Sequence, residues 1–394
     1  MRTRPSTGRG SLVTLVALTL AGCASGWTGF SLNPVDWFNR PKPPPLAPLQ
    51  PIANPTPVRV LWQANIGRAG EGIFIPATAG GDVFAAASDG TVVRLEAATG
   101  RQVWRVRLPS TLTGGVGSDG RLTVVGSSEG EVIALDEDGR TLWRARVSSE
   151  VLAPPVVAGD LVVVRSADSR IFALDARDGR RRWVYQRAAP ALAVRSPSGT
   201  VVRSGFVFAG FSGGKMVALA LNNGGLRWEG TVSLPKGTTE LERVSDVIGL
   251  PWVGDRETCA VAFQGRVACF DLGNGNQIWA RDMSSSAGLG VDGRSVYVSE
   301  DRGAISALDR ASGRSLWRQD KLTNRRLSAP LPVGGEIAFG DLEGNVHFLS
   351  RDTGAFVARF QTDGSPVRAA PVSLAGAGFL VQTSNGNLYA LAPR

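Results

Sequence analysis

A tryptophan recurs about every forty residues through most of the chain, at the end of the same short pattern. The pattern is a β-branched run, a turn ending in glycine, a run ending Ala-Leu-Asp, and then Gly-x-x-x-Trp, as in residues 122–143. Such a period indicates a repeat architecture, in which each unit buries its apolar face against its neighbours. The seven tryptophans are Trp62, Trp104, Trp143, Trp183, Trp228, Trp279 and Trp317.

Each repeat is long enough for four short strands. Apolar runs of period two, bounded by glycine, asparagine and aspartate turns, favour antiparallel meanders. A four-stranded sheet repeated around an axis forms a β-propeller, which protects its edges by radial repetition. The sequence therefore predicts an all-β fold, an eight-bladed β-propeller of four-stranded antiparallel blades over residues 58–394.

The last repeat stops after its third strand, and its tryptophan segment stands at the opposite end of the propeller, at Trp62. An open stack would leave the last sheet one strand short, with an exposed edge. We therefore expect the N-terminal strand, residues 58–64, to complete the last blade and close the ring. The seventh repeat departs from the pattern, because Ala358 stands where a tryptophan is expected.

Each tryptophan falls on the outermost strand expected for its blade. There an indole can cover apolar surface between neighbouring blades, and the small alanine of Ala-Leu-Asp leaves room for it. A stacking platform for a ring-shaped ligand would instead place the tryptophan in the central channel. We therefore interpret the seven tryptophans as structural.

The first 22 residues have the features of an export signal. A basic head precedes a ten-residue apolar run, residues 11–20, which is shorter than the ~20 residues that span a bilayer. Leu20-Ala21-Gly22-Cys23 resembles the lipobox of bacterial lipoproteins, in which the cysteine becomes the acylated first residue. The alternative is an ordinary signal peptide followed by a chance cysteine. No aspartate follows Cys23, and in the lipoproteins that this signal resembles, that implies the outer membrane, facing the periplasm.

Residues 23–57 contain the cysteine expected to carry lipid and nine prolines. Proline fixes the backbone φ angle and favours an extended chain, so this segment is predicted to be a semi-rigid tether.

The composition argues against catalytic activity and against nucleic-acid binding. One histidine and three cysteines are too few ligands for most zinc sites, and a Ser-His-Asp triad would have to use His347. We interpret His347 as a strand-packing residue and predict no catalytic residue and no metal site. The net charge is +9, but no cluster of Lys and Arg is interleaved with aromatics, as nucleic-acid binding would require.

Cys259 and Cys269 flank a predicted hairpin. If Phe263–Gly265 form a three-residue loop with Gly265 left-handed, the two cysteines lie opposite each other and can form a disulfide. An exported protein meets conditions that permit this bond. The alternative is two free core thiols.

The two longest spacings between tryptophans, Trp183 to Trp228 and Trp228 to Trp279, indicate loops on a rigid scaffold, where binding residues often lie. These loops bring apolar and charged residues together, a composition typical of protein–protein hot spots. The alternative is two solvated loops with incidental charges. The candidate partner-binding residues are Leu192, Val194, Arg195, Arg243 and Asp246.

The repeat resembles the PQQ-like propeller repeat across residues 58–394. Quinoprotein dehydrogenases of that fold use a calcium-bound quinone and, in many, an adjacent cysteine pair. This chain has no adjacent cysteine pair and no evident convergence of six to eight oxygens, so we expect no cofactor. An exported PQQ-type quinoprotein dehydrogenase or a ligand-sensing propeller remains the alternative. A glycan-binding lipoprotein is another, and it would require channel-facing aromatics.

A more specific resemblance comes from the two loops, which read L-x-V-R-S and T-E-L-E-R-V-S-D-V. They are similar to segments of the BamB family, lipoprotein subunits of the β-barrel assembly (BAM) complex, that contact a periplasmic POTRA domain of the subunit BamA. The resemblance implies this role for Leu192, Val194, Arg195 and Asp246. Ile248 departs from the pattern, because some members have an acid there. The implied function is a non-enzymatic scaffold that assists the folding and insertion of nascent outer-membrane proteins.

Overall fold

The computed structural model describes residues 1, 44–188, 190, 192–376 and 378–393. The expected signal peptide, Cys23 and most of the tether lie outside these residues. Residues from Pro45 onward form one compact unit. Within the described residues, no helix is long and apolar enough to cross a membrane.

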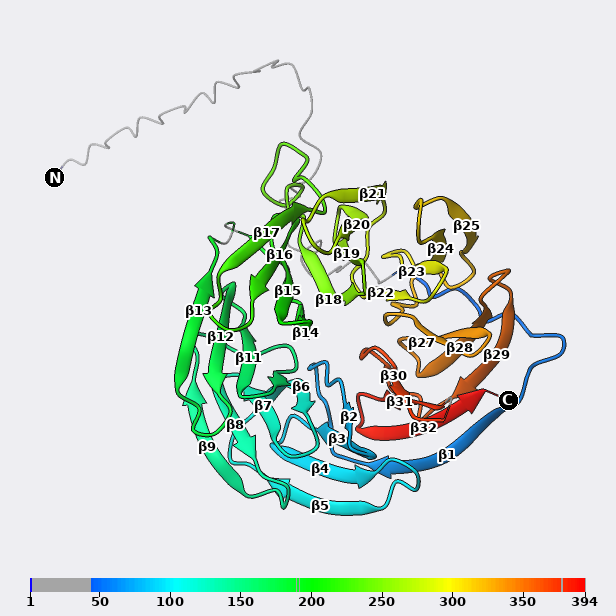
Figure 1. The fold of residues 1–394 in the computed structure, drawn as a ribbon. Helices are drawn as coiled ribbons and strands as arrows, with labels where there is room; N and C mark the ends of the chain where they lie inside the picture. The colour runs from blue at the N-terminus through cyan, green and yellow to red at the C-terminus, as the bar shows by residue number, and fades with distance from the viewer. Residues whose placement is uncertain (2–43, 189, 191, 377, 394) are drawn as a thin grey trace. The chain divides into compact units, whose positions relative to one another are not determined.

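The described residues form eight antiparallel sheets of four strands each, arranged as a ring (Figure 1). Blade 1 comprises β2 (Ala77–Ala79), β3 (Asp82–Ala86), β4 (Thr91–Glu96) and β5 (Gln102–Arg107). Blade 2 comprises β6 (Leu112–Ser118), β7 (Thr123–Ser127), β8 (Glu131–Leu135) and β9 (Thr141–Arg146). Blade 3 comprises β10 (Val156–Ala158), β11 (Leu161–Ser166), β12 (Arg170–Asp175) and β13 (Arg181–Gln186). Blade 4 comprises β14 (Thr200–Arg203), β15 (Phe206–Phe211), β16 (Lys215–Ala220) and β17 (Leu226–Thr231).

The second half of the ring repeats the same meander. Blade 5 comprises β18 (Val247–Val253), β19 (Glu257–Ala262), β20 (Arg266–Asp271) and β21 (Gln277–Asp282). Blade 6 comprises β22 (Gly288–Val291), β23 (Ser295–Ser299), β24 (Ile305–Asp309) and β25 (Ser315–Gln319). Blade 7 comprises β26 (Leu331–Val333), β27 (Glu336–Gly340), β28 (Asn345–Ser350) and β29 (Phe356–Gln361). Blade 8 comprises β30 (Val372–Leu374), β31 (Gly378–Gln382), β32 (Asn387–Pro393) and β1 (Val58–Asn65).

Blade 8 joins the two ends of the propeller, as the sequence predicts. β1 pairs antiparallel with β32, with Trp62 opposite Ala390, and the two strands run side by side in Figure 1. The predicted fold class, an eight-bladed propeller closed by its N-terminal strand, is therefore confirmed.

The tryptophans connect neighbouring blades at seven of the eight junctions. Trp183 of β13, for example, donates its indole N–H to the carbonyl of Leu221 in blade 4 at 2.8 Å. Its ring lies against Gly224, whose φ is +71° and whose added Cβ would come 2.6 Å from the indole. The turn therefore needs glycine both for its left-handed backbone and for the close approach of the ring. The same hydrogen bond, at 2.7–2.9 Å, is made by all seven tryptophans.

The junction between blades 7 and 8 is different. At the other junctions, the tryptophan of one blade packs against the turn between the third and fourth strands of the next blade. In blade 8, the third and fourth strands come from opposite ends of the propeller. Blade 8 thus has no such turn, and Ala358 occupies the tryptophan position. It pairs with Phe348, where most other blades have alanine, so the large and small side chains have exchanged strands. Phe348 makes an edge contact with Phe379 of blade 8 at 5.7 Å between ring centroids.

The meander gives the propeller two ends. Turns between the first and second and between the third and fourth strands lie at one, which we call the turn end. Turns between the second and third strands lie at the other, the loop end, together with the segments that connect successive blades. The glycine turns that receive the tryptophans belong to the turn end.

Cys259 and Cys269 lie opposite each other on β19 and β20 and are joined by a disulfide. The detail of the hairpin loop differs from the expectation. Gln264, not Gly265, has the left-handed backbone, with a φ of 47°. Gly265 instead lies close to Ser233 and Ala262, where an added Cβ would come within 2.8 Å of either side chain.

Part of the segment expected to be a tether is packed on the propeller. The N–H of Ala47 donates to the carbonyl of Thr323 at 3.0 Å, and the N–H of Thr56 donates to that of Val357 at 2.8 Å. Leu49 packs against the core shared by blades 6 and 7. The compact unit therefore begins thirteen residues before β1.

Candidate functional site

Two inter-blade segments at the loop end, residues 192–199 and 232–246, are connected by one carboxylate. Asp246 is 3% exposed, and its Oδ2 accepts the backbone N–H of Val194 at 2.6 Å. Its Oδ1 accepts the N–H of Gly213 in blade 4 at 3.1 Å. Nearby, the hydroxyl of Ser198 donates to the carbonyl of Val247 at 3.0 Å. The segments that precede blades 4 and 5 therefore hold each other in place.

Arg195 lies on the exposed side of this arrangement. It forms a two-pronged ion pair with Glu150 at 3.0 and 2.7 Å, and its side chain remains 64% exposed. The hydrogen bonds to Glu150 raise the pKa of Arg195 above its ordinary value. Leu192, three residues earlier, is 43% exposed. An apolar side chain and a cation are thus presented together from a segment that Asp246 fixes.

Arg243, the fifth predicted residue, is not part of this group of contacts. It is exposed, and its ion pair is with Glu240 at 4.0 Å. Glu242 accepts the backbone N–H groups of Thr238 and Thr239 at 2.8 and 3.1 Å and so closes its own turn. These backbone hydrogen bonds lower the pKa of Glu242.

The structure corrects the role expected for Asp246. The sequence suggested a contact residue, but its carboxylate is buried and both oxygens accept backbone N–H groups. A buried carboxylate must be satisfied by such donors, so Asp246 acts by positioning Val194. Leu192 and Arg195, in contrast, are exposed as expected.

Two hollows border this surface. A cavity of about 260 Å³ lies beside Val194 and Arg195 and is also lined by Arg165 of β11. The central channel holds a larger cavity of about 810 Å³, whose lining includes Arg195 and Trp252. Trp252 is thus an aromatic residue facing the channel, and the guanidinium carbon of Arg310 lies 5.7 Å from its ring centre.

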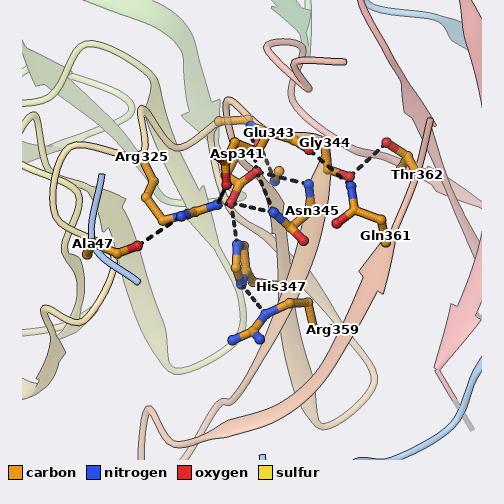
Figure 2. Close-up of polar contacts among 12 residues, drawn as sticks. Ala47, Arg325, Asp341, Glu343, Gly344, Asn345, His347, Arg359, Gln361 and Thr362 are labelled. Carbon is orange, nitrogen blue, oxygen red and sulfur yellow. Dashed lines mark hydrogen bonds and ion pairs between the residues drawn. The ribbon is translucent and has the colours of Figure 1, made fainter. Parts of the chain in front are cut away.

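A buried polar cluster lies between blades 6 and 7 (Figure 2). Asp341 Oδ2 accepts from Arg325 Nε at 2.7 Å and from His347 Nε2 at 2.8 Å. The Nε–H of Arg359 points to Nδ1 of the same imidazole at 3.4 Å, which places the histidine proton on Nε2. Arg325 also donates to the carbonyl of Ala47 at 2.9 Å, so the cluster holds the packed N-terminal segment.

Burial sets the protonation of this cluster. It lowers the pKa of His347, which therefore stays neutral. Burial alone would raise the pKa of Asp341, but hydrogen bonds from His347 and Arg325 outweigh it and hold that pKa below its ordinary value. His347 lies on a strand, β28, as interpreted from the sequence. Its side chain does more than fill space, because both ring nitrogens take part in hydrogen bonds. Among the described residues, no group of three or more His, Cys, Asp and Glu side chains could hold a metal ion.

Sequence reasoning missed Glu150 and Arg165. Glu150 lies in the segment before blade 3, more than forty residues from its partner Arg195, and nothing in the repeat marks it. Arg165 could have been noticed, because a charged residue interrupts the apolar strand Leu161–Ser166 at a position where most other repeats have small or apolar residues.

Eight four-stranded blades, seven of them fastened to the next by a tryptophan, define the chain as a β-propeller of the PQQ-like class. A family model described as outer membrane protein assembly factor BamB matches residues 54–113, 88–319 and 301–394. The BamB of Burkholderia pseudomallei is 43% identical over 353 residues, which cover 89% of this chain and 92% of that relative. The chain belongs to the BamB family.

Solved structures agree with this assignment. The crystal structure of BamB from Moraxella catarrhalis matches with a TM-score of 0.79 and 27% identity, covering 85% of this chain and 99% of that chain. A quinohemoprotein alcohol dehydrogenase from Pseudomonas putida HK5 matches with a TM-score of 0.67. Its identity is 13%, over 85% of this chain and 76% of that chain, so this likeness shows the fold alone.

Proposed function

We propose that this chain is a non-enzymatic scaffold of the BAM complex, anchored by lipid on Cys23 to the periplasmic face of the outer membrane. Its relatives are named outer membrane protein assembly factors, which supports this role. The apolar run that ends at Leu20-Ala21-Gly22-Cys23 supports the anchor. Several acyl chains on one residue would bind firmly, whereas a single chain binds only marginally.

The partner in this proposal is a POTRA domain of BamA. The observation that carries it is the connection of segments 192–199 and 232–246 by Asp246, which leaves Leu192 and Arg195 exposed. A surface that is already ordered loses little conformational entropy on binding. An exposed leucine beside an arginine has the composition of an interface centre, and Arg243 would add a contact at its edge.

In this role the propeller would act by rigidity. Its blades are joined around a closed ring, so a partner held at the loop end is held in a fixed orientation. The scaffold would orient BamA and the rest of the complex while nascent outer-membrane proteins arrive. No step of this kind requires a cofactor.

The test is the variant Arg195→Glu, which places a second carboxylate opposite Glu150. We expect co-purification with BamA from solubilised membranes to fall at least tenfold, since the exposed cation at the proposed contact is replaced by an anion, while the propeller stays folded. Arg101→Glu is the matched control, because Arg101 forms an equivalent two-pronged pair with Glu96 at the turn end and its side chain is 68% exposed. Equal recovery of BamA with both variants would contradict the assigned surface.

A further inference from the structure

The cavity of about 260 Å³ at the loop end has a polar lining. It lies where blades 3 and 4 meet and is bordered by residues 193–196 of the segment that also carries Leu192. A water molecule occupies about 30 Å³ of liquid, so the space can hold a carboxylate-bearing side chain. Five serines are part of the lining: Ser166, Ser169, Ser196, Ser198 and Ser212.

Arg165 brings a positive charge to this cavity. Its guanidinium donates to the carbonyl of Gly210 and lies 4.7 Å from the ring centre of Phe211. Among the described residues, no carboxylate forms an ion pair with it, and the charge of Asp246 acts on it from a longer distance. A guanidinium has five N–H donors, so one carbonyl leaves most of them without a protein acceptor. Burial lowers the pKa of Arg165 to about 10, and the group is therefore still charged at neutral pH.

The carboxylates around the cavity are already occupied. Both oxygens of Asp246 accept backbone N–H groups. Both oxygens of Glu150 bind Arg195. Asp168, beside the cavity, accepts from the hydroxyl of Ser166 and from Arg170. The site thus contains a cation that forms no ion pair among the described residues and on which only the more distant charge of Asp246 acts. The hydroxyls of Ser169 and Ser212 are further polar groups of the lining, and a carboxylate could accept from them and from the guanidinium.

We propose that this cavity receives an aspartate or glutamate side chain of the docked partner, which Arg165 binds as an ion pair. The proposal rests on the proposed function, because Val194 and Arg195 belong both to the docking surface and to the cavity lining. A partner seated on that surface would cover the cavity and exclude water. The ion pair formed there would be desolvated, and it would make the interface specific for an acid at one position.

The test measures the affinity of the full-length protein for the periplasmic POTRA region of BamA by biolayer interferometry. Arg165→Gln should weaken binding at least tenfold. Arg177→Gln is the control, because Arg177 is an exposed arginine at the turn end of the same blade, and it should bind as the wild type does. Ser212→Asp keeps Arg165 but fills the cavity with the chain's own carboxylate, so it should also weaken binding. This second variant decides the question if Arg165→Gln fails to fold.

The outcomes separate this proposal from the one on which it rests. If Arg195→Glu loses binding while Arg165→Gln and Ser212→Asp retain it, the cavity has no role and the docking surface stands. If all three bind as the wild type does, both proposals fail. A melting temperature that sodium formate raises in the wild type but not in Arg165→Gln, with unchanged POTRA affinity, would show a site for free anions and overturn the proposal. The aspartates and glutamates of the POTRA region can also be replaced one at a time by asparagine or glutamine. One of these replacements should have an effect on the affinity that is not additive with the effect of Arg165→Gln.

Discussion

At the turn end of the propeller, one arrangement of tryptophan and glycine recurs at seven junctions between blades, whereas at the loop end the connecting segments differ in length and contacts. The first arrangement depends on a turn that each blade supplies in the same place, and Ala358 marks the one junction where the turn is absent. The second depends on single residues such as Asp246 and Arg195, which occur once. Repetition therefore builds the ring, and the departures from it build the surface that we propose for binding.

The largest effect is expected where the repeated contact is removed. Trp183→Ala deletes a side chain that is 8% exposed and the hydrogen bond from its indole to Leu221. We expect the free energy of unfolding to fall by about 3–5 kcal/mol, the usual cost of such a truncation. Equilibrium urea denaturation followed by tryptophan fluorescence and circular dichroism measures it.

The junction between blades 7 and 8 provides the matched test. Ala358→Trp restores the residue of the repeat, but Ala358 is 1% exposed and faces Phe348, and blade 8 has no turn to receive an indole. We expect overpacking to lower stability by about 1–3 kcal/mol. If Ala358→Trp stabilises the protein, the tryptophan does not depend on a glycine turn in the next blade, and this explanation is wrong.

At the loop end, Asp246→Asn is expected to cost less than the truncation of Trp183. The amide has one acceptor oxygen in place of two, so either Val194 or Gly213 loses its hydrogen-bond acceptor. The loss of a buried partner should cost about 1–3 kcal/mol, and hydrogen exchange at the Val194 amide should quicken. Asp160→Asn, at an exposed turn-end position of blade 3, should change neither quantity. Equal exchange in the two variants would show that Asp246 does not order the segment.

The smallest effect is a pH dependence from the cluster that holds residues 45–50. Burial lowers the pKa of His347 in the folded state, so its contribution to stability is complete above the unfolded value of about 6.5 and is lost as pH falls below it. The loss cannot exceed about 1.4 kcal/mol per pH unit, the slope for one proton. His347→Gln keeps a donor toward Asp341 and should flatten the curve of unfolding free energy between pH 7.5 and 5.

Because His347 is the only histidine in the chain, this titration has a single source among the side chains with ordinary pKa values near 6.5. If His347→Gln leaves the slope of unfolding free energy against pH unchanged, another group takes up the proton. The cluster then does not cause the pH dependence.

The repeated end of the molecule could be predicted from the sequence, and much of the other end could not. The period and the displaced Trp62 were sufficient for eight blades and for the closing pair β1–β32, because each follows from local pattern and edge protection. The loop that carries Leu192 and Arg195 was predicted from the long spacing between tryptophans, and the resemblance to the BamB family singled out these two residues. Asp246 was predicted to bind a partner, and its burial was not foreseen, since a sequence does not show which carboxylate finds backbone donors.

The residues that sequence reasoning missed act through contacts between distant segments. Glu150 meets Arg195 across two inter-blade segments, and Arg325 meets Ala47 across most of the chain. No period or motif encodes such pairs. The packing of the predicted semi-rigid tether from Pro45 onward could not be foreseen for the same reason, because proline content predicts an extended chain but not the surface on which it packs.

The central claim is that the loop end, at the segment fixed by Asp246, is the surface that meets BamA. Photo-crosslinking in cells tests it most directly, with a benzophenone amino acid in place of Leu192 or, as a control, in place of Leu142 on β9. Both side chains are exposed and apolar, at 43% and 54%. The account predicts a BamA adduct from position 192 and none from position 142. An adduct from position 142 alone would contradict it.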